Sequence, residues 1–268
     1  MKRIYLIALL FLMGQHCIAQ SSEDTANGLS IIPASLKFNL DSGDVETKKI
    51  FIVNNMNRKM QFKVYPKDWL RDSVGGHAYF RPDTLPVSCT NWITFDKDFI
   101  EVPPKSRAEL NVTLNVPADV SAIDRMRWAM IFVETIEEKA PAVNGASITQ
   151  NMRVGVHLYQ SPPQLTKKEI QLISFTAVKD SVNQFKIKCK NTGDLQIESK
   201  MYIELSSLKD DFKTTIDGRV FPTFPGQARE FVFIVPDTVP KGKYNAIAAV
   251  DAGDDVPLEA LQAIIEVK

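Results

Sequence analysis

Hydrophobic and polar residues alternate through most of the chain from Leu29 onward. The run 109–116 alternates strictly and stops at Pro117, whereas 128–133 is continuously apolar, as expected of a central strand covered on both faces. A period of two residues is typical of β-strands. The pattern predicts an all-β protein with at most a single helical turn, near 118–124 or 257–261. The other expected strands are 49–53, 60–65, 148–158, 170–178, 184–189, 200–205, 230–235, 244–250 and 260–267.

The chain divides into two halves at Pro162–Pro163. Proline has no N–H to give to a sheet, and consecutive prolines stiffen a connection. The halves also repeat one pattern, because a proline-led turn precedes an alternating strand at 104–116 and again at 225–235. We therefore expect two tandem β-sandwich domains of one general design, at 28–160 and 165–268.

Residues 1–19 have the composition of a secretory signal peptide. Lys2 and Arg3 precede a short apolar run, and the segment ends at Ala19 after other small or apolar residues. A membrane-spanning helix needs roughly 20 apolar residues, so this run is too short to be an anchor. We expect cleavage after Ala19 and export from the cytosol. Lipidation of Cys17 is the alternative.

The charge balance argues against a nucleic-acid or anionic-lipid partner. The chain has 32 basic and 32 acidic residues, and removal of Lys2 and Arg3 leaves 30 and 32. No later segment has the length and apolarity of a membrane span. Cys89 and Cys189 both lie in alternating runs, and we interpret them as buried thiols in different domains. The sequence leaves a disulfide between them open.

Several segments of the first half resemble the PapD-like periplasmic chaperones of pilus and fimbrial assembly. The segments are 29–36, 49–54, 62–69, 92–95, 103–107, 125–134 and 153–159. The similarity covers 29–162 at low identity, and the second half is immunoglobulin-like only in a general sense. The resemblance implies two immunoglobulin-like β-sandwiches, no cofactor, and a periplasmic molecular chaperone for an exported or surface protein subunit. Outer-membrane assembly machinery would be a further partner. Sandwich domains of cell-wall-interacting bacterial proteins share the opening pattern.

The carboxylate anchor of the pilus chaperones is missing. Those proteins grip the terminal carboxylate of their client with an arginine on the first strand and a lysine on the last strand of the first domain. Here the lysine position falls near Val156, and the first strand has no arginine. Lys37 and Arg153 are the basic residues on these two strands that could replace the anchor.

The stretch 148–158 is the candidate client-binding strand. Its residues Ile148, Met152, Val154, Val156 and Leu158 share one face, and Arg153 lies among them. Such a strand can pair with a foreign chain through its backbone while alternate side chains fill a groove in the client. The competing interpretation is that these side chains face the core of their own domain. Exposure of Met152 and Val154 would favour binding.

Catalysis has little support in the sequence. His77 and His157 are far apart, and no nucleophile, metal or phosphate-binding motif occurs. The acidic stretch 251–255 lacks the ligand spacing of a calcium loop and predicts a hairpin turn. We expect a protein that is not an enzyme and binds no metal. The competing function is a structural or adhesive envelope protein that binds cell wall or glycan. Trp69, Trp92 and Trp128 are most simply core residues of the first sandwich. Partial exposure of Trp69, next to the polar stretch 71–77, is the alternative that would suit glycan binding.

A short pattern of Asp, a hydroxyl residue, and alanine or an aliphatic residue recurs five times. It resembles an O-glycan acceptor pattern of some bacterial periplasms, although each triplet can also be an Asx-type turn. The candidate acceptors are Thr25, Ser73, Thr84, Ser181 and Thr238.

Overall fold

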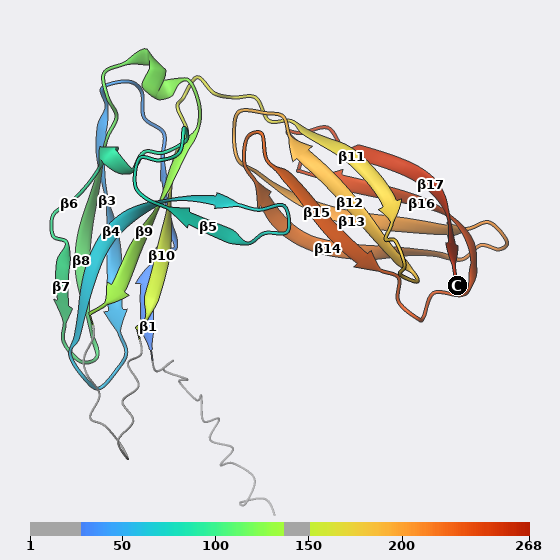
Figure 1. Ribbon diagram of the computed structural model, residues 1–268, viewed down its shortest axis with the longest axis horizontal. Coiled ribbons are helices and arrows are strands. Elements are labelled where there is room, and N and C mark those ends of the chain that lie inside the picture. The colour runs from blue at the N-terminus through green and yellow to red at the C-terminus, as the bar shows by residue number, and fades with distance from the viewer. Residues whose placement is uncertain (1–27, 137–150) are drawn as a thin grey trace, which may run out of the picture.

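Nearly every element of the protein is a β-strand (Figure 1). The computed structural model describes residues 28–136 and 151–268. Single turns of 3-10 helix occur at η1 (Thr90–Trp92) and η2 (Val120–Ile123), the second where a helical turn was expected. The other place considered for a turn, 257–261, is not helical, because strand β17 (Glu259–Val267) begins there. In the described parts of the chain, no helix has the length and apolarity needed to cross a membrane. The all-β prediction is confirmed.

Three predictions concern positions outside the described residues. They are the signal peptide at 1–19, the acceptor Thr25 and the strand residue Ile148. They remain predictions from the sequence.

The first sandwich consists of two sheets that face one another. One sheet has the strand order β1-β3-β8-β6, and the other has the order β2-β10-β9-β4-β5, with β7 paired to β4. The strands are β1 (Leu29–Ile32), β2 (Ser35–Phe38), β3 (Val45–Asn54), β4 (Met60–Arg71), β5 (His77–Phe80), β6 (Ile93–Phe95), β7 (Phe99–Val102), β8 (Ser106–Asn115), β9 (Arg127–Thr135) and β10 (Arg153–Gln160).

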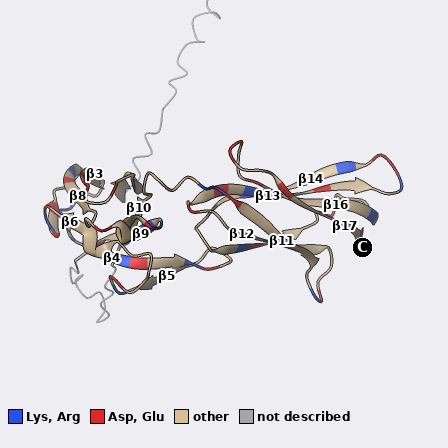
Figure 2. Ribbon diagram, turned by 90° about the horizontal axis from the view of Figure 1, so that it is seen from above, with Lys and Arg blue, Asp and Glu red and all other residues tan. Residues whose placement is uncertain are grey.

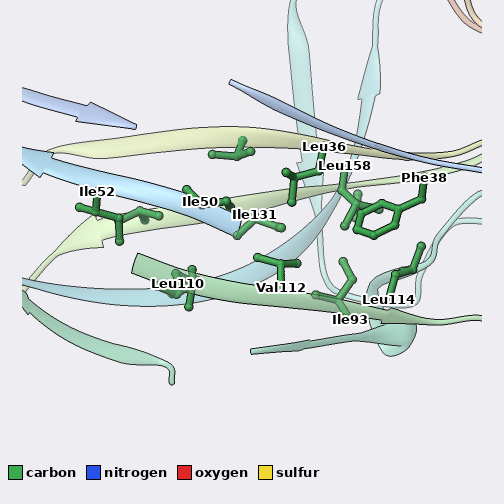
Figure 3. Close-up of a cluster of buried hydrophobic side chains, with 14 of the residues drawn as sticks. Leu36, Phe38, Ile50, Ile52, Ile93, Leu110, Val112, Leu114, Ile131 and Leu158 are labelled. Atoms are coloured by element: carbon green, nitrogen blue, oxygen red, sulfur yellow. The ribbon is translucent and has the colours of Figure 1, made fainter. Parts of the chain in front are cut away.

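Alternate side chains of these strands fill the space between the two sheets. Ile50 and Ile52 of β3 are fully buried, as are Leu110 and Leu114 of β8 on the adjoining strand. The facing sheet contributes Ile131 to the same cluster (Figure 3). The period of two in the sequence therefore marks inward-facing positions, as expected of a sandwich.

The start of the chain contributes to both sheets of the first sandwich. β1 pairs antiparallel with β3, whereas β2 pairs parallel with β10. The chain crosses between the sheets at Pro33 and Ala34, so β1 and β2 each cover only part of an edge. This crossing determines which part of β10 remains unpaired.

The second sandwich has sheets of order β11-β12-β15 and β14-β13-β16-β17. Its core contains Phe185, Ile187, Met201, Ile203, Tyr244 and Val250. The edge strand β14 was not expected, because Gly218 and Pro222 interrupt a largely polar pattern. The strands are β11 (Ile170–Ala177), β12 (Gln184–Asn191), β13 (Ile197–Ser207), β14 (Lys213–Thr223), β15 (Ala228–Ile234), β16 (Gly242–Asp251) and β17 (Glu259–Val267).

The repeat found in the sequence corresponds to a repeated structure. β8 pairs antiparallel with β3, and β15 pairs antiparallel with β12 in the same way. Each preceding turn contains a residue with positive φ, Lys105 at 51° and Gly226 at 75°. Asn54 and Asn191 end β3 and β12, and both are buried and donate to backbone carbonyls of later segments. The two sandwiches therefore share one design. That 28–160 and 165–268 fold independently is a proposal.

Charged residues of both signs are interleaved on the two sandwiches (Figure 2). Lys49 and Glu109 form an ion pair of 2.7 Å across neighbouring strands, and Lys200 and Asp217 form one of 2.6 Å. Such exposed pairs contribute little to stability. They agree with the balanced charge of the sequence and do not make a single-sign surface.

A second apolar cluster joins the two sandwiches. Phe224, which follows β14, is fully buried against Trp69, Trp128 and Tyr159 of the first sandwich. Trp128 Nε1 donates to the carbonyl of Trp69 at 2.9 Å. In Figure 1 the β5 hairpin extends from the first sandwich toward the second. Trp69 is buried, as in the simpler interpretation of the sequence, and Phe224 and two histidines cover the ring that the alternative interpretation left partly exposed.

Candidate functional site

The last strand of the first sandwich is paired along only part of one edge. β9 pairs with all of β10, from Arg153 to Gln160. On the other side β2 pairs only with the half from His157 to Gln160. Among the described residues, no strand pairs with that side of β10 between Arg153 and Val156. We call this stretch, 153–156, the open edge.

The backbone groups at the open edge can be assigned from the neighbouring hydrogen bonds. The carbonyl of Met152 accepts from the Thr135 N–H of the β9 side, whereas the His157 N–H donates to Ala34 O on the opposite side. Because successive residues of a strand direct these groups to alternate sides, even-numbered residues of β10 pair with β9. The N–H and C=O groups of Arg153 and Gly155 therefore point to the open edge.

The side chains beside the open edge are partly apolar and partly accessible. Val154 is half-buried, and Met152 packs at the margin of the first core. Ile32, at the end of β1, is 56% exposed. Leu29 and Ile31 of β1 also pack at the margin of this core. The apolar side chains of Met152 and Val154 thus accompany backbone groups with which no described strand pairs.

Two of the residues predicted to contact a client have their side chains buried in the core. Val156 and Leu158 are fully buried in the core of their own sandwich, and Figure 3 shows Leu158 beside Leu36. The prediction that their side chains fill a client groove does not fit this arrangement. They face inward because the even-numbered side chains of β10 point into the space between the two sheets. Met152 and Val154, nearer the open end, are the accessible members of that face.

Arg153 lies on the outer face of the sheet. Its guanidinium is 4.5 Å from the centre of the Phe132 ring and 5.8 Å from that of Tyr79. Nearby, Glu134 accepts a hydrogen bond from Tyr65 and forms an ion pair of 3.2 Å with Lys63. These two contacts, first that with Tyr65, lower the pKa of Glu134. Arg153 is thus an exposed cation on an aromatic base, directly at the open edge.

Lys37 and Arg153 do not form one anchor. Lys37 lies on β2 opposite Tyr159, six residues along β10 from Arg153. At about 3.3 Å per residue, this separates the two positions by roughly 20 Å. Lys37 instead borders a cavity of about 210 Å³ that Met126, Tyr159 and Gln196 also line, between the two sandwiches.

The structure brings together two histidines that the sequence separates by 80 residues. The Nε2 atoms of His77 and His157 are 3.5 Å apart, and Arg71 Nη2 is 3.0 Å from His77 Nε2. Both rings pack on Trp69 with centroids 4.9 Å apart. Sequence reasoning missed the pair because β5 joins β4 through a turn that carries no strong apolar pattern. Alternation in β4 and β10 alone would have placed Trp69 and His157 on one outer face.

Burial lowers the pKa of both histidines. The pKa of His157 falls to about 4, first through desolvation and then through the charges of His77 and Arg71. The pKa of His77 is lowered by desolvation and by Arg71, and Asp72 partly offsets this. Both imidazoles are therefore neutral at pH 7, with His77 Nε2 as the acceptor for the Arg71 guanidinium.

The two cysteines are buried free thiols in different sandwiches. Burial raises the pKa of the Cys189 thiol to about 12 and raises that of Cys89 as well. Neither group is suited to nucleophilic or redox chemistry, which requires an accessible thiolate. The structure contains no disulfide between them.

No metal centre is found among the described residues. Groups of three or more His, Cys, Asp or Glu side chains able to hold an ion are absent from them. The acidic stretch after β16 forms the expected turn, in which Gly253 N–H donates to the Asp251 carboxylate at 2.9 Å. That the chain is not an enzyme remains a prediction.

The four described glycan-acceptor candidates are all exposed and lie in turns or loops: Ser73, Thr84, Ser181 and Thr238. Asp83 and Asp180, which precede two of them, have positive φ values of 59° and 57°. An aspartate at positive φ is typical of a turn. The arrangement therefore agrees with the turn interpretation and leaves the hydroxyl groups accessible.

The sequence matches no protein-family model and no curated protein. The structure is similar to a chain of the chaperone–tip adhesin complex of CFA/I fimbriae biogenesis, with 11% identity over 88% of this chain and 98% of that chain, and a TM-score of 0.48.

Two further fimbrial structures give similar values. A chain of the CsuC–CsuE chaperone–tip subunit complex of Acinetobacter baumannii has 13% identity over 90% and 98% of the two chains, with a TM-score of 0.48. The class 5 fimbriae chaperone CfaA has 12% identity over 90% and 99%, with a TM-score of 0.47. Each of these similarities extends over 88–90% of this chain. At these identities the likeness concerns the fold alone.

Proposed function

We propose that this protein is an exported, chaperone-like assembly factor that binds an extended polypeptide by strand pairing at the open edge of β10. The observation that carries the proposal is that none of the described strands pairs with the outward backbone groups of Arg153 and Gly155. Natural sheets normally protect such edges. A client strand added here would continue the sheet beside β9 and β10.

Backbone pairing alone is too weak to account for binding. Two residues offer four hydrogen-bonding groups, each contributing about 0.5–1.5 kcal/mol net. The resulting sum of about 2–6 kcal/mol is similar to or smaller than the entropic cost of association. Apolar client side chains must therefore also pack on Ile32, Met152 and Val154. The client segment is accordingly extended and carries apolar residues at alternate positions.

The basic residues would have separate roles. Arg153 lies beside the open edge and would pair with a carboxylate on the adjoining part of the client. Lys37 lies at the cavity between the sandwiches and would contact a different segment. One carboxylate cannot bridge both, because roughly 20 Å separates their strand positions.

The biological setting is part of the same proposal. The client would be an exported or surface subunit, met in the periplasm or at the cell surface, with outer-membrane assembly machinery as a possible later partner. The alternative function, glycan binding, would need an exposed aromatic side chain on which a sugar can stack. Trp69 was the candidate for this role, and both Trp69 and Trp128 are buried.

A proline at residue 153 tests the proposal. Arg153→Pro removes an N–H that points to the open edge and leaves the β9 pairing intact, a position where proline is tolerated. Arg153→Ala is the matched control, since it removes the same guanidinium but keeps the N–H. We expect the wild type to co-purify a stoichiometric exported subunit from envelope extracts, identified by mass spectrometry. Arg153→Ala should recover less of it, because the guanidinium is gone, and Arg153→Pro should lose it. Equal recovery by Arg153→Pro and Arg153→Ala, or recovery of wall polymer alone, would reject strand pairing.

A further inference from the structure

The β4–β5 hairpin connects the first sandwich to the second. We define the latch as the end of β4, the turn Asp72–Gly76 and β5. Its carbonyl at Ser73 accepts from the Glu230 N–H at 2.8 Å and from Arg229 Nε at 3.2 Å, both in β15. Within the turn, the Asp72 carboxylate accepts from the N–H groups of Gly75 and Gly76 at 2.7 Å. The second sandwich is thus held by a preformed turn.

The base of the latch contains the histidine pair. His77 begins β5 and is paired with Arg71 of β4, and its Nε2 accepts from the Arg71 guanidinium. A neutral imidazole has one acceptor nitrogen. Protonating His77 therefore places the proton on the atom that Arg71 now contacts, so the hydrogen bond is lost and two cations face each other. His157 Nε2 lies 3.5 Å away on the other side.

We propose that protonation of the His77–His157 pair releases the latch and frees the second sandwich to move relative to the first. The geometry supports this, because His77 lies directly after the turn that contacts β15. Added positive charge at His77 would act on the same short hairpin that carries Ser73. This inference does not depend on the identity of a client or on the open edge.

The charged groups around the histidine pair oppose an added proton. Protonation is therefore expected to open the latch. His157 interacts with His77 and Arg71, and His77 interacts with Arg71, Arg229 and Asp72. The ring of Tyr79 stacks on His77 with centroids 6.0 Å apart, and the ring of Tyr159 stacks on His157 at 5.7 Å. Two contacts favour the charged forms: the hydrogen bond with the Ala34 backbone for His157, and Asp72 for His77. Desolvation and the neighbouring positive charges outweigh these contacts, because the pKa of each histidine is lowered.

The interior of the latch also gains hydration when it opens. Trp69 Nε1 and Arg71 Nε are buried and have no hydrogen-bond partner among the described residues. Buried polar groups without partners are costly. Opening would expose both atoms to water and offset part of the lost apolar contact with Phe224.

The test measures the distance between the sandwiches in the mature chain from Gln20 onward, which lacks Cys17. Lys49→Cys and Lys213→Cys supply exposed labelling sites on the two sandwiches, while Cys89 and Cys189 are buried and should stay unlabelled. Spin-label distance distributions are compared at about pH 7.5 and about pH 4, the range in which these histidines change charge. We expect the distribution to widen about twofold at the lower pH, as a population shift to open states. The His77→Asn/His157→Asn double variant should not widen.

A second pair of variants applies the same test without acid. At neutral pH, His77→Lys adds a permanent charge, whereas His77→Gln stays neutral at the same position. We expect a widened distribution for His77→Lys and a wild-type distribution for His77→Gln. An unchanged wild type at low pH would overturn the proposal, as would a double variant that widens equally. Identical distributions for His77→Lys and His77→Gln would also overturn it.

Discussion

The ring of Phe224 packs edge-on against Trp69, with centroids 5.2 Å apart and planes at 89°. This contact joins the second sandwich to the outer face of the first, and both side chains are fully buried. Edge-to-face aromatic pairs contribute about 0.5–1.5 kcal/mol beyond the burial of their area. The contact makes Phe224 the principal apolar link between the two sandwiches.

Phe224→Ala should therefore loosen the joint and destabilise the chain. We expect a loss of about 3 kcal/mol or more in the free energy of unfolding, as is usual for removing a buried phenylalanine. Chemical denaturation followed by tryptophan fluorescence measures this loss, because Trp69 and Trp128 both contact Phe224. Val232→Ala, at an exposed position of β15, is the control and should change stability little. A Phe224→Ala loss no larger than that of the control would contradict this role.

The free energy of unfolding should decrease as the pH is lowered from 6.5 to 4. The folded-state pKa of His157 is about 4, below the ordinary value of 6.5. The unfolded chain therefore binds the proton first, so the contribution of neutral His157 is fully present above pH 6.5. It is lost as pH falls toward 4, and the loss is constant below that value. With allowance for partial exposure, we expect about 1–2 kcal/mol.

Denaturant midpoints measured across this pH range check the prediction. His157→Asn removes the titrating group and should flatten the slope between pH 6.5 and 4. A slope equal to that of the wild type would mean that other groups are responsible for the loss of stability.

The two buried asparagines, Asn54 and Asn191, should contribute equally to the free energy of unfolding. Asn54 Nδ2 donates to the carbonyls of Val102 and Pro103 at 3.1 and 3.0 Å. Asn191 Nδ2 donates to those of Leu195 and Thr223 at 2.8 and 2.9 Å. Replacing either by alanine removes two hydrogen bonds to buried or partly buried carbonyls, so we expect a loss of about 2–3 kcal/mol for each in urea unfolding. Asn115→Ala, at an exposed position, should cost almost nothing, and a similar cost there would refute the assignment.

Glycosylation remains a proposal that one mass measurement decides. If the exposed hydroxyls of Ser73, Thr84, Ser181 and Thr238 carry glycans, protein purified from its native envelope should exceed the mass of the unmodified mature chain. Each Ser→Ala or Thr→Ala substitution should then remove one increment. A mass equal to that of the unmodified chain would exclude the modification.

Much of the architecture could be predicted from alternation because inward positions recur every second residue. The strands around Ile50, Leu110 and Ile131 are found where they were expected. β14 escaped prediction because an edge strand tolerates Gly218 and Pro222, which interrupt the pattern. Within the described residues, the strand expected at 148–158 corresponds to β10, which begins at Arg153 and ends at Gln160.

The candidate site was less predictable, because it depends on pairing between distant segments. Only the crossing at Pro33 and Ala34 determines that β2 covers His157 and leaves Arg153 uncovered. The burial of Val156 likewise depends on the facing sheet. The His77–His157 contact requires the β5 hairpin to fold back over β10, and no local pattern signals that.

Amide hydrogen exchange along β10 tests the central claim most directly. In the free protein we predict fast exchange for the N–H groups of Arg153 and Gly155, which point to the open edge, and slow exchange for Val154 and Val156, which pair with β9. Binding of a client strand should slow the first two and leave the second two unchanged. Equal protection of all four amides in the free protein would show that the edge is already occupied and would contradict the account.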